Sequence, residues 1–346
     1  MNIQELLTLA IERKASDLHI SDNLGPRIRI DGELIPLNLP TGSKRNVLEL
    51  LSPVVSKNHL ENFEANWETD FSMMLPDVGH FRVNIFRQNF GTSAALRVIP
   101  PRTFTLDELG LPPIIKKIAE MPNGLVLVTG PTGCGKSTTL AAIIQHINKR
   151  LTKHIITIED PIEYVHESLS CIIDQREVGR DTKSFSAALR SALREDPDII
   201  LVGELRDLET VQLALTAAET GHLVFATLHT SSAPKTIDRI IDIFPAGGER
   251  SLIQNILSES LQSVISQKLL KKVGGGRVSA IELMMCTPAI RSLIRDDKIS
   301  QISSAIQTGA DVGMQTMDQH LKKLVMDKVI SPETAAQVAN NKDFFK

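Results

Sequence analysis

The chain has 346 residues, a length that predicts two domains, each large enough to bury a core of its own. Charged residues make up 23% and hydrophobic residues 42% of the chain, a balance typical of globular proteins that argues against disorder. The formal net charge is -3, and the chain has one Trp and one Tyr, so composition disfavours binding to a nucleic-acid backbone or stacking on bases.

The first residues, MNIQELLTLAIERK, have the period of an amphipathic helix and lack the basic start and apolar core of a secretory signal. No apolar run reaches the length of about 18 residues that a membrane-spanning helix needs. Cys134, Cys171 and Cys286 lie far apart and form no C-x-x-C pair, which fits a reducing compartment. We therefore predict a cytoplasmic chain without a transmembrane segment.

Together with this first helix, residues 1–99 are predicted to form a small α+β N-terminal domain. Alternating apolar runs within residues 17–37 flank Asp31-Gly32, a pair typical of a tight hairpin turn. A helical stretch and three strand-like runs follow, at residues 44–64, 69–75, 79–88 and 92–99. Proline pairs at both ends of PPRTFTLDELGLPP then predict a semi-rigid linker over residues 100–112.

Over residues 113–346, apolar runs alternate with helical stretches, which predicts a parallel sheet covered by helices and an α/β fold class. The clearest buried strands are LVLVTG, HIITIE, DIILVGE and HLVFATLH. Beyond Phe244 we expect helices almost throughout, apart from the glycine run at 274–276 and a short strand in RVSAIELM.

GPTGCGKS at residues 130–137 matches G-x-x-x-x-G-K-[ST] and lies between a predicted strand and a predicted helix, as a phosphate-binding loop requires. Its glycines let backbone N–H groups turn toward phosphate oxygens at a helix N-terminus. Lys136 is expected to hold the β and γ phosphates of ATP, and the Ser137 hydroxyl to bind Mg²⁺. The nucleotide-binding residues predicted here are Gly130, Pro131, Thr132, Gly133, Cys134, Gly135, Lys136, Ser137 and Thr138.

Acidic residues follow the next predicted strand, in ITIEDPIE, at the strand end where ligands of α/β sheets bind. We interpret Glu163 as the residue that orients and deprotonates the attacking water, with Glu159 and Asp160 beside the nucleotide. The alternative is a solvated turn fixed by Pro161.

Two further strand ends contribute candidates. DPDIILVGE ends in Glu204, which is expected to support Mg²⁺ through its water shell although many such enzymes carry Asp there. HLVFATLHT is bracketed by His222 and His229; His222 is expected to contribute to nucleotide binding, and His229 is expected to sense the γ phosphate. The alternative for either histidine is a structural hydrogen bond.

Cys134 lies inside the phosphate loop, next to a helix N-terminus and Lys136. A small residue that simply fits is the plainer interpretation. The alternative is a thiol of lowered pKa and raised reactivity.

ITIEDPIE, ILVGELRD and TAAETGHLVFATLHT resemble the Asp box, Walker B segment and His box of the secretion ATPase superfamily, which powers type II secretion, type IV pili and related machines. The similarity covers nearly the whole chain. ASDLHIS, ALREDPDIILVGELRDLET, LSESLQSVISQ and GMQTMDQHL further resemble its pilus-retraction, or twitching-motility, branch. The resemblance implies a RecA-like P-loop ATPase core with a PAS-like N-terminal domain and a helical C-terminal region.

The resemblance also implies a homohexamer at the cytoplasmic face of the inner membrane, at the pilus base. Arg82 in GHFRVNIF and Arg97 in ALRVI match the positions that this family uses opposite the phosphates of a neighbouring subunit. The implied partners are an inner-membrane platform protein and a paralogous accessory retraction ATPase.

AIRSLIR at residues 289–295 resembles a family motif that retraction needs and hydrolysis does not. We expect a helix that turns Ala289 and Ile290 inward and Arg291 and Arg295 outward; a plain amphipathic helix is the alternative. The chain lacks the extra N-terminal domain and four-cysteine motif of the assembly ATPases, which favours retraction. The remaining alternatives are an accessory retraction ATPase, another secretion-system ATPase, a nucleic-acid translocase and a small-molecule kinase.

Overall fold

The computed structural model describes residues 2–22, 24–30, 32–37, 46–99, 103–245 and 247–345. It divides the chain into two compact units. The first unit is residues 1–102 together with two later segments, 160–165 and 177–181; the second is the remainder. Nothing in the sequence pattern indicated that these two later segments join the first unit.

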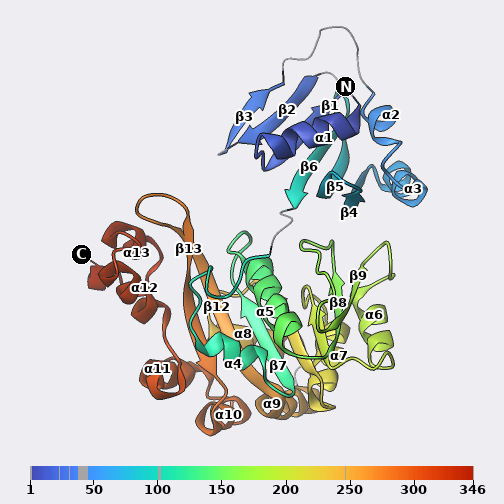
Figure 1. Ribbon diagram of the computed structural model, residues 1–346. Helices are drawn as coiled ribbons and strands as arrows, with labels where there is room; N and C mark the ends of the chain where they lie inside the picture. The colour runs from blue at the N-terminus through green and yellow to red at the C-terminus, as the bar shows by residue number, and fades with distance from the viewer. Residues whose placement is uncertain are drawn as a thin grey trace. The chain divides into compact units, whose positions relative to one another are not determined.

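The first unit consists of one antiparallel sheet and three α-helices within its described residues (Figure 1). Across the sheet the strands are β3 (Glu33–Pro36), β2 (Leu24–Ile30), β1 (Asp17–Ser21), β6 (Gly91–Ile99), β5 (Gly79–Gln88) and β4 (Glu68–Leu75). The helices are α1 (Ile3–Glu12), α2 (Val47–Leu51) and α3 (Lys57–Asn66). The α+β class is confirmed, and a PAS-like topology stays a prediction.

Helix α1 forms because apolar residues recur on one face of a segment that Asn2 caps: the Asn2 side chain accepts a hydrogen bond from the Glu5 N–H. The buried residues of α1 are Ile3, Leu6, Leu7 and Ala10, and they share one core with Leu18 and Phe81 of the sheet. Each large apolar side chain buried in this way contributes about 1.5–3 kcal/mol.

The predicted hairpin is present, since β2 and β3 pair antiparallel with Ile30 opposite Glu33. Asp31, which we placed in its turn, lies outside the described residues, as do residues 100–102 of the predicted linker. The helical stretch expected over residues 44–64 consists of two helices, α2 and α3, separated at residues 52–56; residues 44 and 45 lie outside the described residues.

The second unit is built on a sheet whose strands run, in spatial order, β13 (Arg277–Met285), β12 (Leu261–Lys271), β7 (Gly124–Thr129), β11 (Leu223–Leu228), β10 (Ile199–Val202), β8 (His154–Glu159) and β9 (Ile172–Glu177). The strands from β12 to β8 pair in parallel, and β13 is antiparallel to β12. The α-helices of this unit are α4 (Ile114–Ala119), α5 (Lys136–Arg150), α6 (Phe185–Ala192), α7 (Leu208–Glu219), α8 (Ala233–Asp242), α9 (Gly248–Ser260), α10 (Pro288–Arg295), α11 (Ile302–Thr308), α12 (Met317–Met326) and α13 (Pro332–Val338).

Both faces of this sheet are covered, as its continuous apolar strands predict. Val126 and Phe225 pack in one core with Ile115 of α4 and Ile143 of α5. The alternate residues of the same strands, such as Leu125, are equally buried and belong to the other face. The parallel α/β core is therefore confirmed, as is the helical C-terminal region formed by α10 to α13 (Figure 1). Within the described part of the chain, no helix combines the length and hydropathy that crossing a bilayer demands.

Two strands of this sheet were missed or misread from the sequence. We expected helices after Phe244, but residues 261–271 form β12, which pairs with β7 and β13 and is buried along most of its length. LQSVISQKLLK mixes polar residues into an apolar run. The buried Ser263, Ser266 and Gln267 side chains are hydrogen-bonded to partners from distant segments, which the local sequence does not reveal. The edge strand β9 has too few apolar residues to predict.

Candidate nucleotide site

The phosphate loop connects β7 to α5, so the strand, loop and helix that the motif requires are all present. Gly135 stands at the N-cap of α5 with φ 92°, a left-handed conformation that favours glycine. A Cβ on Gly130 would lie 2.4 Å from the Gln267 carbonyl oxygen, so a larger residue does not fit there. The Lys136 ammonium donates to the Gly130 carbonyl at 2.9 Å and the Pro131 carbonyl at 3.2 Å, which folds it over the loop.

The strand order brings the other predicted segments to the same edge of the sheet. β11 is next to β7, followed by β10 and β8, and all four run in parallel. Glu159, Glu204 and His229 come at or just past the carboxyl ends of these strands, where open α/β sheets bind ligands. Their side chains therefore come to the edge from which the phosphate loop begins.

Glu204 and His229 are in contact across two adjacent strands. The His229 Nε2 lies 3.2 Å from one Glu204 carboxylate oxygen, and an Arg206 guanidinium nitrogen lies 2.8 Å from the other. Gly203 lets β10 end close to its neighbour, because a Cβ there would lie 3.1 Å from the Ile158 carbonyl oxygen. The Glu204 side chain is one-fifth exposed, so it can still be approached.

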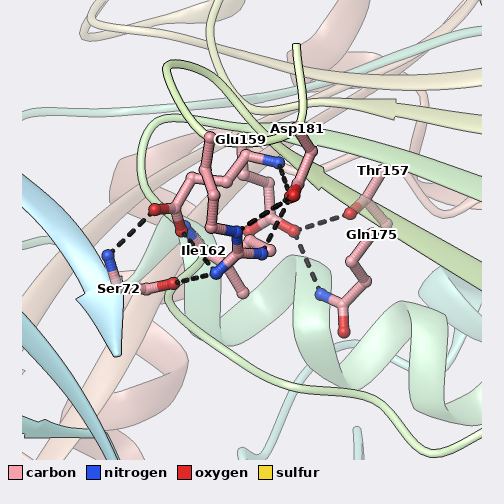
Figure 2. Close-up of polar contacts among 8 residues, drawn as sticks. Ser72, Thr157, Glu159, Ile162, Gln175 and Asp181 are labelled. Atoms are coloured by element: carbon pink, nitrogen blue, oxygen red, sulfur yellow. Dashed lines mark hydrogen bonds and ion pairs between the residues drawn. The ribbon is translucent and has the colours of Figure 1, made fainter. Parts of the chain in front are cut away.

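The Glu159 carboxylate is held by hydrogen bonds from two side chains of the second unit (Figure 2). One of its carboxylate oxygens accepts hydrogen bonds from the Thr157 hydroxyl at 2.7 Å and the Gln175 side-chain amide at 3.2 Å. These contacts fix the end of β8, from which the chain continues to Glu163.

His222 does not join this group. It precedes β11, and its main-chain oxygen accepts a hydrogen bond from Gly124, the first residue of β7. The phosphate loop follows the last residue of β7, about 20 Å away at the rise of an extended strand. The His222 ring bonds the Ala217 carbonyl at 3.0 Å, which favours the alternative of a structural hydrogen bond over nucleotide binding.

Gln267 on β12 contacts the phosphate loop and was not a candidate from sequence. Its side-chain amide donates to the Cys134 carbonyl at 2.8 Å and accepts from the Thr139 hydroxyl of α5 at 3.0 Å. The residue is buried, and on the preceding residue the Ser266 hydroxyl bonds the Thr129 hydroxyl. We overlooked both because we expected a helix in this segment.

The Cys134 thiol is buried, and the burial raises its pKa, with the charge of Lys136 opposing the rise only in part. The hypothesis of a lowered pKa is therefore wrong. Although Cys134 precedes the N-terminus of α5, its thiol lacks the solvent contact that stabilises a thiolate.

Iodoacetamide at neutral pH is expected to leave ATP hydrolysis within about twofold of the untreated rate, because a buried thiol of raised pKa reacts slowly. The measurement is phosphate release after timed exposure, with Cys134→Ser as the control that assigns any effect to this position. Rapid inactivation of the wild type, slowed by nucleotide and absent from C134S, would restore the reactive-thiol hypothesis.

In the first unit, Arg82 and Arg97 stand directly opposite each other on β5 and β6. The Arg82 guanidinium bonds the Asp70 carboxylate at 2.7 and 3.2 Å, and its Nη1 lies 3.3 Å from Glu163 Oε1. The hydrogen bond with Asp70 is the main cause that raises the pKa of Arg82, and Glu163 adds to it. Arg97 bonds Asp17 at 3.0 Å and is two-thirds exposed.

These two arginines line a small cleft of about 120 Å³ with Glu163 and Tyr164, all within the first unit. Two guanidinium groups on neighbouring strands repel each other unless anions lie beside them. Asp70, Asp17 and Glu163 supply that compensation here. Sequence reasoning placed the arginines opposite a neighbour's phosphates and missed their contact with acids of their own chain.

The helix expected at residues 289–295 is α10, and Arg295 is exposed as predicted, but Arg291 differs from the prediction. Arg291 does not point outward: its guanidinium donates to the Ser258 and Glu259 carbonyls at the end of α9 and to the Gln262 side chain. A cation there satisfies the unpaired carbonyls of a helix C-terminus. Ile290 is buried as predicted, whereas Ala289 is exposed.

The protein-family model described as "Type II/IV secretion system protein" matches residues 1–275. The "Type IV pilus retractation ATPase PilT" of Pseudomonas aeruginosa is 58% identical over 98% of this chain and 98% of its own length. A "Twitching motility protein" of Neisseria gonorrhoeae is 54% identical over 92% of this chain and 85% of its own. A solved structure, "Crystal Structure of the Pilus Retraction Motor PilT and Bound ADP", covers 99% of this chain and 98% of its own, at 48% identity and a TM-score of 0.93.

Proposed function

This chain belongs to the type II/IV secretion system protein family, and from that premise we propose that it is an ATP-hydrolysing motor that drives type IV pilus retraction in twitching motility. The observation that carries the proposal is similarity to a retraction ATPase over nearly the full length of both chains. The ADP bound to the similar retraction motor supports nucleotide use at the phosphate loop.

The chemistry we propose divides the work among residues of both units. Lys136 and the backbone N–H groups of the loop bind the phosphates, and Glu163 orients water in line with the γ phosphorus and takes its proton. Glu163 follows the end of β8 by four residues along the chain. Arg82 and Arg97, from a neighbouring subunit, stabilise the charge that develops on the phosphoryl oxygens.

Mg²⁺ fits the residues available. No group of three or more His, Cys, Asp or Glu side chains that could hold a metal occurs in the described part of the chain, and Mg²⁺ bound with ATP needs few protein ligands because phosphates and waters supply the rest. Ser137 and Glu204 would hold it, Glu204 through water, since Arg206 and His229 already contact its oxygens. The ion would neutralise phosphate charge during transfer.

We further propose that six copies form a ring in the cytoplasm, associated peripherally with the inner membrane at the pilus base. Its partners would be an inner-membrane platform protein and a PilU-like paralogue. The formal net charge of -3 opposes a nucleic-acid substrate.

Deleting the gene tests the proposal. Cells without the motor are expected to carry surplus pili that never shorten, seen by labelling pili and following them over time, and to lose twitching. A plasmid copy should restore shortening, whereas a copy with Lys136→Ala should not. Loss of pili from the deletion strain would show an assembly role and overturn the proposal.

A further inference from the structure

Glu177 at the end of β9 has a buried carboxylate that the proposed mechanism does not use. Its side chain is 1% exposed, a rare condition for a glutamate unless every oxygen is satisfied. One oxygen accepts a hydrogen bond from the backbone N–H of Ser72 on β4 at 2.9 Å. The other accepts from the backbone N–H of Ile162 at 3.1 Å.

The second of these bonds is the informative one. Ile162 directly precedes Glu163, and its own side chain is buried. Glu177, Ser72 and the segment 160–165 all belong to the first unit. A single carboxylate therefore joins a strand of the sheet to the backbone that carries the proposed general base.

The Arg180 guanidinium and the carboxylate of Asp181, which is labelled in Figure 2, hold Glu177 itself. Arg180 places Nη1 3.9 Å from the Glu177 carboxylate and 3.2 Å from the Ser72 hydroxyl, and it pairs with Asp181 at 2.8 Å. Asp181 in turn accepts from the Glu177 backbone N–H at 2.9 Å. The rotamer of Glu177 is thus fixed from both ends.

Arg82 approaches the same loop from β5, where it contacts the Glu163 carboxylate. Glu177 holds the backbone before Glu163 whether Arg82 stays on the Glu163 carboxylate of its own chain or acts on a neighbour's phosphates. A general base must be held within hydrogen-bond reach of its water, and a displacement of about 1 Å can cost 100-fold in rate.

We propose that Glu177 is a positioning residue for hydrolysis, which acts by linking the loop that carries Glu163 to strand β4. The inference rests on the proposed function, in which Glu163 activates water. Glu177 itself touches no reacting atom.

Glu177→Gln is the sharpest test, because it keeps size and shape but places an amide NH₂ where one of two N–H donors needs an acceptor. We expect kcat to fall about 10- to 100-fold with the KM for ATP within about twofold, since nucleotide binding depends on the phosphate loop. The matched control is Glu195→Gln, which breaks a neighbouring Arg–Glu pair, Arg176 with Glu195 at 3.0 Å, and is expected to leave kcat within about twofold.

A double-mutant cycle separates positioning from general damage. If Glu177 acts only through Glu163, E177Q lowers kcat in the wild-type background and has no further effect in the Glu163→Gln background. Equal losses in both backgrounds, or a rise in KM that matches the fall in kcat, would overturn the inference. A normal rate for E163Q alone would instead refute the role proposed for Glu163.

Should E177Q fail to fold, Arg180→Met gives the same test from the surface, since Arg180 is 41% exposed and supports Glu177 from outside. A smaller loss of kcat that disappears in the E163Q background is the expected result. A loss that persists there, or none at all, would contradict the proposal.

Discussion

Replacing Glu163 by glutamine is expected to lower the ATPase rate at least about 100-fold while nucleotide affinity stays near that of the wild type. The amide keeps the shape of the side chain and can still accept one hydrogen bond, but it cannot take the proton from water. Phosphate release gives the rate, and the fluorescence of a labelled nucleotide gives the affinity.

Glu167→Gln is the matched control for E163Q, because the same change is made four residues further along, at an exposed side chain. It should hydrolyse ATP within about twofold of the wild type. A Glu163→Gln rate within about threefold of the wild type would remove Glu163 as the base and leave the acids of Glu159 or Asp160 to be tested.

Replacing Arg82 by alanine is expected to reduce kcat by about 10³ to 10⁵, the range found when an arginine finger is removed from other P-loop enzymes. Arg87 on the same strand provides the control, since its guanidinium lies over the rings of Phe63 and Trp67 at 5.9 and 5.4 Å. Arg87→Ala should cost some stability through lost packing and leave turnover near normal.

Mixing two inactive variants shows whether Arg82 acts on its own subunit or on a neighbouring one. In a mixed ring, a chain with R82A still offers Glu163, and a neighbour with E163Q still offers Arg82, so about a quarter of the interfaces hold both. Recovery of the ATPase rate toward a quarter of the wild-type rate supports action of Arg82 on the neighbouring subunit. If the contact of Arg82 with Glu163 of its own chain is the working one, the mixture stays as inactive as its parts.

The sequence predicted the parallel core well because β7, β8, β10 and β11 are continuous apolar runs, each followed by residues of recognisable chemistry. It predicted poorly where burial depends on polar partners. Gln267 reads as a surface residue, and only the pairing of β12 with β7 shows that it bonds the phosphate loop.

Contacts between distant segments account for the other misses. Glu177 lies 105 residues beyond Ser72, and no local period indicates that they touch. Likewise, Arg291 has the spacing of an outward-facing helix residue, but the open carbonyls of α9 draw its guanidinium inward. His222 and His229 flank one strand, and only the direction of that strand sends them to opposite edges.

Strand β12 connects the phosphate loop to the C-terminal helices. Gln267 bonds the loop, and the next residue, Lys268, donates to the Val338 carbonyl of α13 at 2.8 Å. Successive side chains of a strand point to opposite faces, so one peptide unit separates the two contacts. If the phosphate loop shifts when nucleotide is exchanged, β12 would shift with it through Gln267. The contact of Lys268 with α13 would then pass that displacement to the C-terminal helices.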